Sequence, residues 1–221
     1  MSTVAEPAYR KRIGYQAGLL GGFATLAAAL LILGNNSTHQ AIAERQAEDL
    51  LESLSQVIPD SLHDNNLLEN AILIEDAQGQ PLTVYRAMKA QHLTGLAYAA
   101  IGQGYAGEIK LLIGLKPDGS LIGVRVLAHA ETPGLGDMIE IEKDRWITTF
   151  NGRSLSNTAA SAWQVKKDGG DFDQFSGATI TPRAVVRAVH EALQFFAEHR
   201  DELAVMSEDQ QPGETDSEVS R

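Results

Sequence analysis

The stretch EIKLLIGLKPDGSLIGVRVL (residues 108–127) decides the fold. Two apolar runs, 108–115 and 121–127, flank the segment Lys116-Pro117-Asp118-Gly119-Ser120. Proline, aspartate, glycine and serine favour tight turns for separate physical reasons, and their clustering between two apolar runs predicts a β-hairpin. We therefore expect an antiparallel sheet at the core of the chain.

The segments on either side extend this hairpin into an α+β domain. Residues 71–75 and 82–88 are expected to pair across a turn at 77–80, and 93–101 forms another strand, which gives four or five strands. Residues 40–57 and 182–200 have apolar positions at helical spacing, so the second of these helices is expected to pack one face on the sheet. Shorter helical patches are expected within 136–150. Strands with flanking helices indicate the α+β class.

An uncharged run precedes this domain. Residues 13–33 would span roughly 31 Å as a helix, close to the thickness of a bilayer core. Arg10-Lys11-Arg12 lies just before the run, so the positive-inside rule places residues 1–12 in the cytoplasm and 34–206 outside it. A cleaved signal peptide with an Ala41-Ile42-Ala43 site is the alternative, and it exports the same domain. Residues 207–221 are acidic, lack aromatic residues and are expected to be disordered.

Composition excludes several classes of function. The chain of 221 residues has 18 basic and 29 acidic residues, and this acidic balance argues against nucleic-acid binding. The absence of cysteine excludes disulfides, thiolate catalysis and cysteine-ligated iron–sulfur clusters. The six histidines have no metal-site spacing, and Ser176 lacks the G-x-S-x-G context of a nucleophile, so we predict neither a metal site nor a catalytic residue.

The stretch DQFSGAT (173–179) is followed by ITPR, which reads as the start of a helix. We expect Thr181 to be the N-cap and Pro182 the first helical residue. A helix N-terminus suits a phosphate, and the Thr179 hydroxyl just upstream is well placed to carry one. Arg183 and Arg187 either accompany such an anion or belong to a solvated face, in which Arg187 pairs with a residue four positions later.

A second stretch, HAETPGLG (129–136), is at least a turn. Its glycines also give a flexible backbone that can approach a planar ring closely. Gly102, Gly104 and Gly107 spell G-x-G-x-x-G, but a strand rather than a helix follows, so we expect a bend and not a dinucleotide-binding loop. Trp146 is a weaker candidate for stacking on a ring, because buried tryptophans usually belong to the core.

Together with the chain layout, the two stretches resemble the G subunit family of the Rnf/Rsx ion-translocating electron transport complex, and the likeness covers nearly the whole chain. The related C subunit of the sodium-pumping NADH:quinone reductase has similar motifs. The resemblance implies FMN joined through its phosphate to Thr179. It also implies that Asp173, which could otherwise cap its own loop, helps a flavin transferase to recognise the site. It assigns no clear role to Glu131. The other residues expected around the flavin are Ser176, Gly177, Ala178, Thr181, Thr132, Gly134 and Leu135.

By this resemblance the chain is a membrane-anchored flavoprotein that relays electrons in a bacterial inner membrane. It would cross the membrane once, place its main domain on the periplasmic side and assemble with other membrane subunits of the complex. An unactivated threonine hydroxyl is a poor nucleophile, so attachment would need a separate transferase that uses FAD and a divalent metal. The alternatives are the C subunit of the sodium-pumping reductase, a module that binds a ligand non-covalently outside the cytoplasm, and a purely structural subunit.

Overall fold

The computed structural model describes residues 13–76 and 79–204, in two compact units that meet between Leu50 and Leu51. The first unit consists of most of helix α1 (Ile13–Val57), which is continuous where the sequence predicted two helical stretches. Within it, Ile13–Ile32 is long and apolar enough to cross a membrane, and its side chains are exposed. The predictions for residues 1–12 and 207–221 lie outside the described residues.

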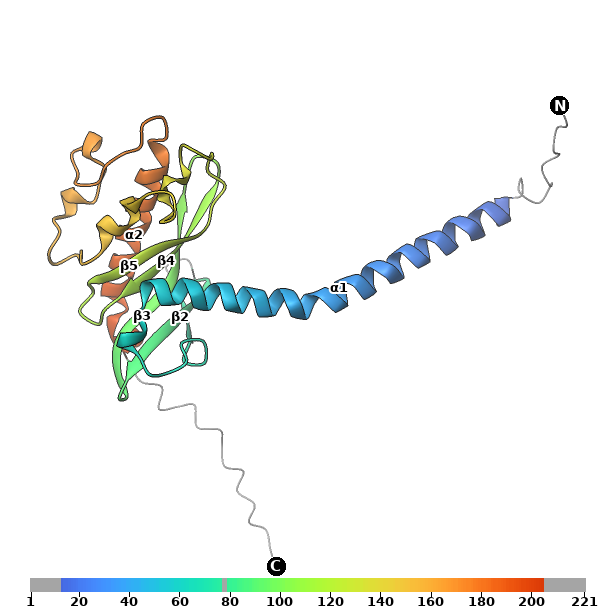
Figure 1. The fold of residues 1–221 in the computed structure, drawn as a ribbon, viewed down its shortest axis with the longest axis horizontal. Helices are drawn as coiled ribbons and strands as arrows, with labels where there is room; N and C mark the ends of the chain where they lie inside the picture. The colour runs from blue at the N-terminus through green and yellow to red at the C-terminus, as the bar shows by residue number, and fades with distance from the viewer. Residues whose placement is uncertain (1–12, 77–78, 205–221) are drawn as a thin grey trace, which may run out of the picture. The chain divides into compact units, whose positions relative to one another are not determined.

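The second unit is built on one antiparallel sheet of five strands (Figure 1). Each strand pairs with its sequence neighbour, in the order β1-β2-β3-β4-β5. The observed bounds differ from the predicted ones by no more than two residues at any strand end. The strands are β1 (Ile72–Glu75), β2 (Pro81–Lys89), β3 (His92–Gln103), β4 (Glu108–Leu115) and β5 (Leu121–Ala128).

The predicted turn between β4 and β5 closes as its residue types require. The amide of Lys116 donates to the carbonyl of Ser120 at 2.9 Å, and Gly119 has a φ of +83°, which glycine adopts without a steric penalty. The Asp118 carboxylate accepts hydrogen bonds from both the amide and the hydroxyl of Ser120, at 2.8 and 2.6 Å. Local side-chain chemistry therefore helps to fix the register of the β4–β5 hairpin.

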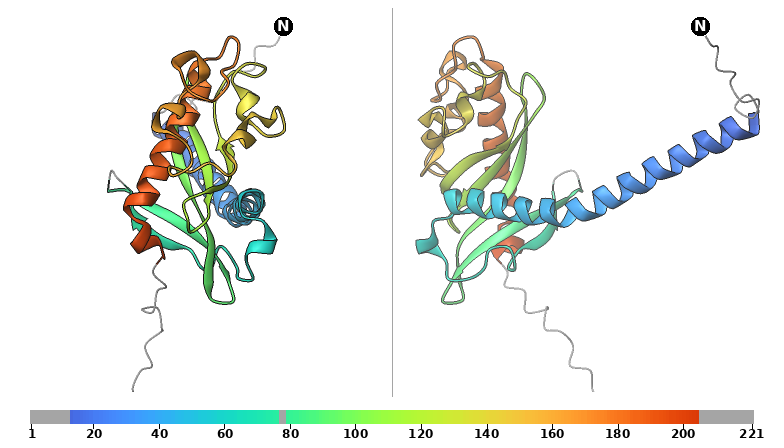
Figure 2. Two further views of the ribbon diagram at one scale, coloured as in Figure 1. Left: turned by 90° about the vertical axis from the view of Figure 1, so that its left-hand side faces the viewer. Right: turned by 45° about the vertical axis from the view of Figure 1, so that its right-hand side comes forward.

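Helix α2 (Ile180–Glu198) covers one face of the sheet (Figure 2, left). Its apolar side packs on the alternate residues of β4 that include Leu111 and Ile113, and the Tyr98 hydroxyl donates to the carbonyl of Ala192 at 2.6 Å. The patches expected within 136–150 are 3₁₀ helices, η3 (Asp137–Ile139) and η4 (Arg145–Phe150), and they extend this core. The remaining short helices are η2 (Asp60–Leu62), η5 (Ala160–Ala162), η6 (Lys166–Asp168) and α3 (Arg200–Ala204).

The last turns of α1 pack on the opposite face of the sheet. Leu54, Val57 and Ile58 are fully buried there. The fit depends on a glycine, because a Cβ atom on Gly114 of β4 would lie 2.6 Å from the carbonyl oxygen of Val57. The helix backbone thus lies directly against the strand, and the sheet is enclosed on both sides.

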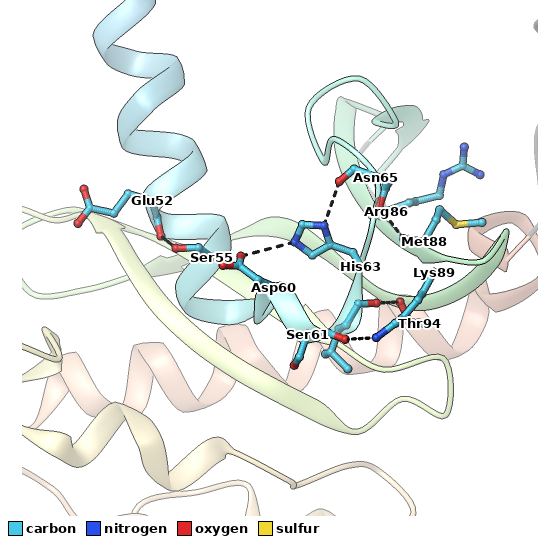
Figure 3. Close-up of polar contacts among 11 residues, drawn as sticks. Glu52, Ser55, Asp60, Ser61, His63, Asn65, Arg86, Met88, Lys89 and Thr94 are labelled. Atoms are coloured by element: carbon cyan, nitrogen blue, oxygen red, sulfur yellow. Dashed lines mark hydrogen bonds and ion pairs between the residues drawn. The ribbon is translucent and has the colours of Figure 1, made fainter.

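Polar contacts fix the segment that leads from α1 into the sheet (Figure 3). The Asn65 side chain bridges the backbone of β2: its Nδ2 donates to the carbonyl of Arg86 at 2.9 Å, and its Oδ1 accepts from the amide of Met88 at 2.8 Å. The Lys89 ammonium donates to the carbonyl of Ser61 at 2.7 Å, and the Thr94 hydroxyl donates to that of Leu62. These bonds hold the end of α1 in register with the strands.

Candidate functional site

Three segments that are distant in the chain enclose a hollow of about 340 Å³. They are the β3–β4 turn, the loop that follows β5, and the residues that lead into α2. A hollow of this size lies in the range of small-molecule sites. It is lined by Tyr105, Glu131, Thr132, Leu135, Gly136, Gly177, Ala178, Thr179, Ile180 and Thr181.

Buried aromatic side chains hold the segment before α2 in place. Phe175 is 5 % exposed and packs edge to face on Trp146, with 5.1 Å between the ring centroids. The Trp146 indole N–H donates to the carbonyl of Asp173 at 2.8 Å. Between Phe175 and Ala178 the chain makes a tight turn, with Gly177 at a φ of +83°. The turn leaves Ser176 and Gly177 exposed. Trp146 itself is a core residue, so the structure does not support its use as a stacking platform.

The predicted helix cap was wrong. Helix α2 begins at Ile180 with Thr179 as its N-cap, and the backbone of Thr179 is itself close to helical (φ −81°, ψ −17°). Thr181 is instead fully buried within the first turn, and its hydroxyl donates to Oε2 of Glu131 at 2.5 Å. The Thr179 hydroxyl makes no capping hydrogen bond, and the residue is only partly buried. It therefore remains available for chemistry.

The two arginines that suggested an anion have partners within the chain. Arg183 makes two hydrogen bonds to Asp168, with distances of 2.5 and 2.9 Å, and these hold the pKa of the Asp168 carboxyl below its usual value. Arg187 lies 3.8 Å from Glu191, and both side chains are exposed. These contacts favour the solvated-face interpretation, and neither arginine requires an anion nearby.

Asp173 also differs from the expected loop cap. Its carboxylate pairs with Lys166 at 2.7 Å, and both side chains are more than half exposed. The carboxylate therefore stays accessible on the surface, which leaves open the predicted recognition by a transferase.

The loop after β5 forms a turn in which Thr132, Pro133, Gly134 and Leu135 occupy successive positions. The amide of Leu135 donates to the carbonyl of Thr132 at 3.1 Å, and Gly134 has a φ of +78°. Proline followed by a glycine with positive φ is the pattern of a type II turn. The amide of Gly134 is held by Asp137 at 2.7 Å, and the turn presents Thr132 and Leu135 to the hollow.

Glu131 lies in the loop after β5, and its carboxylate is hydrogen-bonded to the other two segments that enclose the hollow. It is 5 % exposed, and its Oε1 accepts from the amide of Ala106 in the β3–β4 turn at 3.0 Å while its Oε2 accepts from Thr181. Two glycines make room for it: a Cβ on Gly104 would lie 2.3 Å from Oε1, and a Cβ on Gly136 would lie 2.8 Å from Oε2. This explains Gly104 in the G-x-G-x-x-G run, which β4 follows as predicted.

The hollow brings together many of the residues predicted from the sequence. Thr132, Leu135, Gly177, Ala178, Thr179 and Thr181 line it, whereas Ser176, Gly134 and Asp173 do not. Tyr105 and Ile180 were not predicted; they are 73 and 46 % exposed and contribute apolar surface. The glycines around Tyr105 were the only signal for its position. In the part of the chain that the structure describes, no group of His, Cys, Asp or Glu is arranged to hold a metal ion.

Comparison with known proteins connects this geometry to a family. The FMN-binding domain family matches residues 104–194, a range that contains every residue lining the hollow. The G subunit of the ion-translocating oxidoreductase complex of Cereibacter sphaeroides is 49 % identical over 185 residues, which are 84 % of each chain. The corresponding G subunit of Stutzerimonas stutzeri is 48 % identical over 189 residues, 86 % of this chain and 83 % of that one. The chain belongs to this G subunit family.

Membership in the G subunit family confirms the predicted resemblance and the predicted fold, a candidate membrane helix followed by an antiparallel FMN-binding domain. Among solved structures, the crystal structure of NqrC from Shewanella oneidensis is similar over 63 % of this chain and 74 % of that one, at 23 % identity and a TM-score of 0.45. A likeness this distant carries no functional argument.

Proposed function

We propose that this chain is a membrane-anchored flavoprotein subunit that relays electrons through an FMN whose phosphate is esterified to Thr179. One observation carries the proposal. Within the FMN-binding domain, Thr179 lies on the wall of the hollow and is partly buried, and its helix does not use its hydroxyl for capping.

The surroundings of Thr179 fit a phosphoester. As the N-cap of a 19-residue helix, Thr179 would place the phosphate at the positive end of the helix dipole, which stabilises an anion. Gly177 and Ala178 precede it and keep bulky side chains away. Gly177 in particular combines a positive φ with a Cβ position only 3.4 Å from Leu135.

The rest of the hollow fits an isoalloxazine ring. Tyr105, Leu135 and Ile180 supply apolar surface for the flat aromatic system, and the hydroxyl of Thr132 supplies a polar group at the edge. FMN, when bound, supplies the redox chemistry, and the protein sets its position and surroundings. The side chains of this site would hold the ring, limit its contact with water and place a carboxylate beside it.

Attachment needs a second protein. Among the described residues, no side chain is hydrogen-bonded to the Thr179 hydroxyl, so none of them activates it as a nucleophile. A flavin transferase would use FAD and a divalent metal: the threonine oxygen attacks the FMN phosphorus, AMP leaves, and the hydroxyl proton passes to a base of the transferase. Exposed Asp173 is suited to contact that enzyme.

The candidate membrane helix supports a location in the inner membrane. Ile13–Ile32 would cross the inner membrane of a bacterium once, with residues 1–12 in the cytoplasm and the FMN-binding domain in the periplasm. The relatives are named as subunits of an ion-translocating oxidoreductase complex, so this chain would work with other membrane subunits. The span contains no charged residue, and ion movement would therefore depend on those partners.

Fluorescence of the protein band in a denaturing gel tests the covalent bond. Full-length protein produced together with a flavin transferase should fluoresce, and Thr179→Val, which preserves side-chain shape, should not. Ser161→Ala is the control, because it removes an exposed hydroxyl outside the hollow and outside both sequence stretches and should leave fluorescence intact. A dark wild-type band, or a Thr179→Val band as bright as wild type, would refute the proposal.

A further inference from the structure

We propose that Glu131 sets the reduction potential of the bound flavin, by holding a buried negative charge against the hollow. This inference rests on the proposed function, because it requires FMN in that hollow. It assigns a task to a carboxylate that neither the sequence motifs nor the family assignment explains.

The position of Glu131 is fixed from several directions. Its side chain is 5 % exposed and lines the hollow. The amide of Ala106 and the hydroxyl of Thr181 hold one carboxylate oxygen each, and the residue's own amide donates to Nδ1 of His129 at 3.0 Å. Because that nitrogen accepts a hydrogen bond, the imidazole proton lies on Nε2, which contacts Glu140 at 2.6 Å. The contacts of His129 with Glu131 and Glu140 thereby hold the loop that carries Glu131 in place.

The charge of Glu131 is only partly compensated. Its two hydrogen-bond donors are neutral, and the N-terminal end of α2 adds a partial positive charge. Among the described residues no lysine or arginine forms an ion pair with it, although Asp137 and Glu140 nearby do have cationic or imidazole partners. Because no cation in the described part of the chain cancels this charge, its field extends into the hollow, where the low dielectric constant strengthens it.

The backbone is shaped around this carboxylate rather than around a smaller side chain. Gly104 and Gly136, from two different segments, leave the space that its two oxygens fill. Neutral acceptors would satisfy the same two donors, whereas a carboxylate also brings a formal negative charge to the wall of the hollow.

The direction of the effect follows from Coulomb's law. Uptake of two electrons and one proton from the buffer would make the bound flavin more negative by one charge, and a negative charge beside it opposes that change. At the effective dielectric constant of a protein, a unit charge at about 8 Å changes an equilibrium constant by roughly thirtyfold. Glu131 should therefore lower the reduction potential of the flavin.

Spectroelectrochemical titration of full-length, flavin-loaded protein tests this inference. Electrons come from the electrode through dye mediators and protons come from the buffer, at a pH well above the ordinary carboxyl range. Glu131→Gln keeps the shape and the acceptor for Ala106 but removes the charge, and it should raise the potential by an amount equal to at least a roughly tenfold change in the equilibrium constant. Glu142→Gln removes a charge from an exposed side chain that does not line the hollow and should leave the potential close to that of wild type.

A second variant should shift the reduction potential in the opposite direction. Thr181→Val removes a hydrogen-bond donor from Glu131 while the carboxylate stays, so the charge is less compensated and the potential should fall. If Glu131→Gln does not take up flavin, Thr181→Val decides the question: a potential at or above the wild-type value overturns the inference. A flavin-loaded Glu131→Gln whose potential is unchanged also overturns the inference, and so does a Glu142→Gln whose potential shifts by the same amount. Flavin content is measured first, and a wild-type protein without flavin would refute the proposed function instead.

Discussion

The contact between the last turn of α1 and the sheet can be tested with a single methyl group. In Gly114→Ala, the new Cβ would lie 2.6 Å from the carbonyl oxygen and 2.9 Å from the Cβ of Val57, both too close for real Cβ contacts. Gly123 is the cross-strand neighbour of Gly114, and a Cβ there would lie 3.5 Å from the Cα of Val57, an ordinary van der Waals distance. Gly123→Ala is therefore a matched control.

The loss of folding stability in Gly114→Ala has a lower and an upper bound. If the helix end shifts slightly and stays packed, overpacking costs about 1–3 kcal/mol. If it leaves the sheet, three fully buried aliphatic side chains (Leu54, Val57 and Ile58) become exposed, at about 1.5–3 kcal/mol each. The Arg125 guanidinium also donates to Gln56 at 2.9 Å and opposes complete detachment. We therefore expect a loss of about 1–3 kcal/mol for Gly114→Ala. For Gly123→Ala we expect a change of no more than about 1 kcal/mol.

Urea unfolding of full-length protein in detergent, followed by tryptophan fluorescence, measures this difference. Trp146 and Trp163 are both buried in the domain core and report on its unfolding. Gly114→Ala should lower the midpoint with little change in the slope, as expected when stability alone changes. Equal midpoints for the two variants would refute the reasoning, and so would a Gly114→Ala midpoint at the wild-type value.

Two further substitutions probe hydrogen bonds that connect separate segments of the domain. Gly104→Ala places a Cβ 2.3 Å from Oε1 of Glu131, so it should lower the free energy of unfolding by about 1–3 kcal/mol and speed hydrogen exchange of the Ala106 amide; unchanged exchange at that amide would contradict the assignment. Tyr98→Phe removes the bond to the carbonyl of Ala192 and should cost about 0.5–1.5 kcal/mol in urea unfolding near neutral pH. Burial raises the pKa of Tyr98, so this residue's contribution is present below the ordinary tyrosine value of about 10 and is lost as the pH rises beyond it. Wild type should then lose stability more steeply than Tyr98→Phe above that pH, and parallel curves would contradict the assignment.

Local sequence signals were sufficient for the sheet. Apolar runs and turn residues lie next to each other in the chain, and the turn at Asp118-Gly119 closes through its own side chain and backbone. Such features depend on neighbours within a few residues, so strand positions could be predicted without knowledge of the tertiary structure.

The start of α2 could not be predicted in the same way. Thr181 is a residue type favoured at N-caps and is followed by proline, as is common at a helix start. Its hydroxyl nevertheless donates to Glu131, which lies 50 residues earlier in the chain. Likewise Arg183 resembles an anion ligand until η6 brings Asp168 beside it. Tertiary contacts of this kind override local preference, and no spacing in the sequence reveals them.

The hollow is the part of the site that most depends on long-range contacts. The two stretches around Thr132 and Thr179 were visible as motifs, but Tyr105 joins them only because Glu131 reaches the β3–β4 turn. The role of Glu131 follows from three segments meeting at one carboxylate. Its sequence context, next to a proline-glycine turn, gives no hint of burial.

The proposed ester at Thr179 can be tested directly on protein purified from its native host. Trypsin should release residues 168–183 as one peptide, which contains Ser176, Thr179 and Thr181 as possible acceptors. We expect its mass to exceed that of the unmodified peptide by FMN less one water, with fragment ions that place the addition on Thr179. An unmodified peptide, or an adduct on either of the other two hydroxyls, would contradict the central proposal.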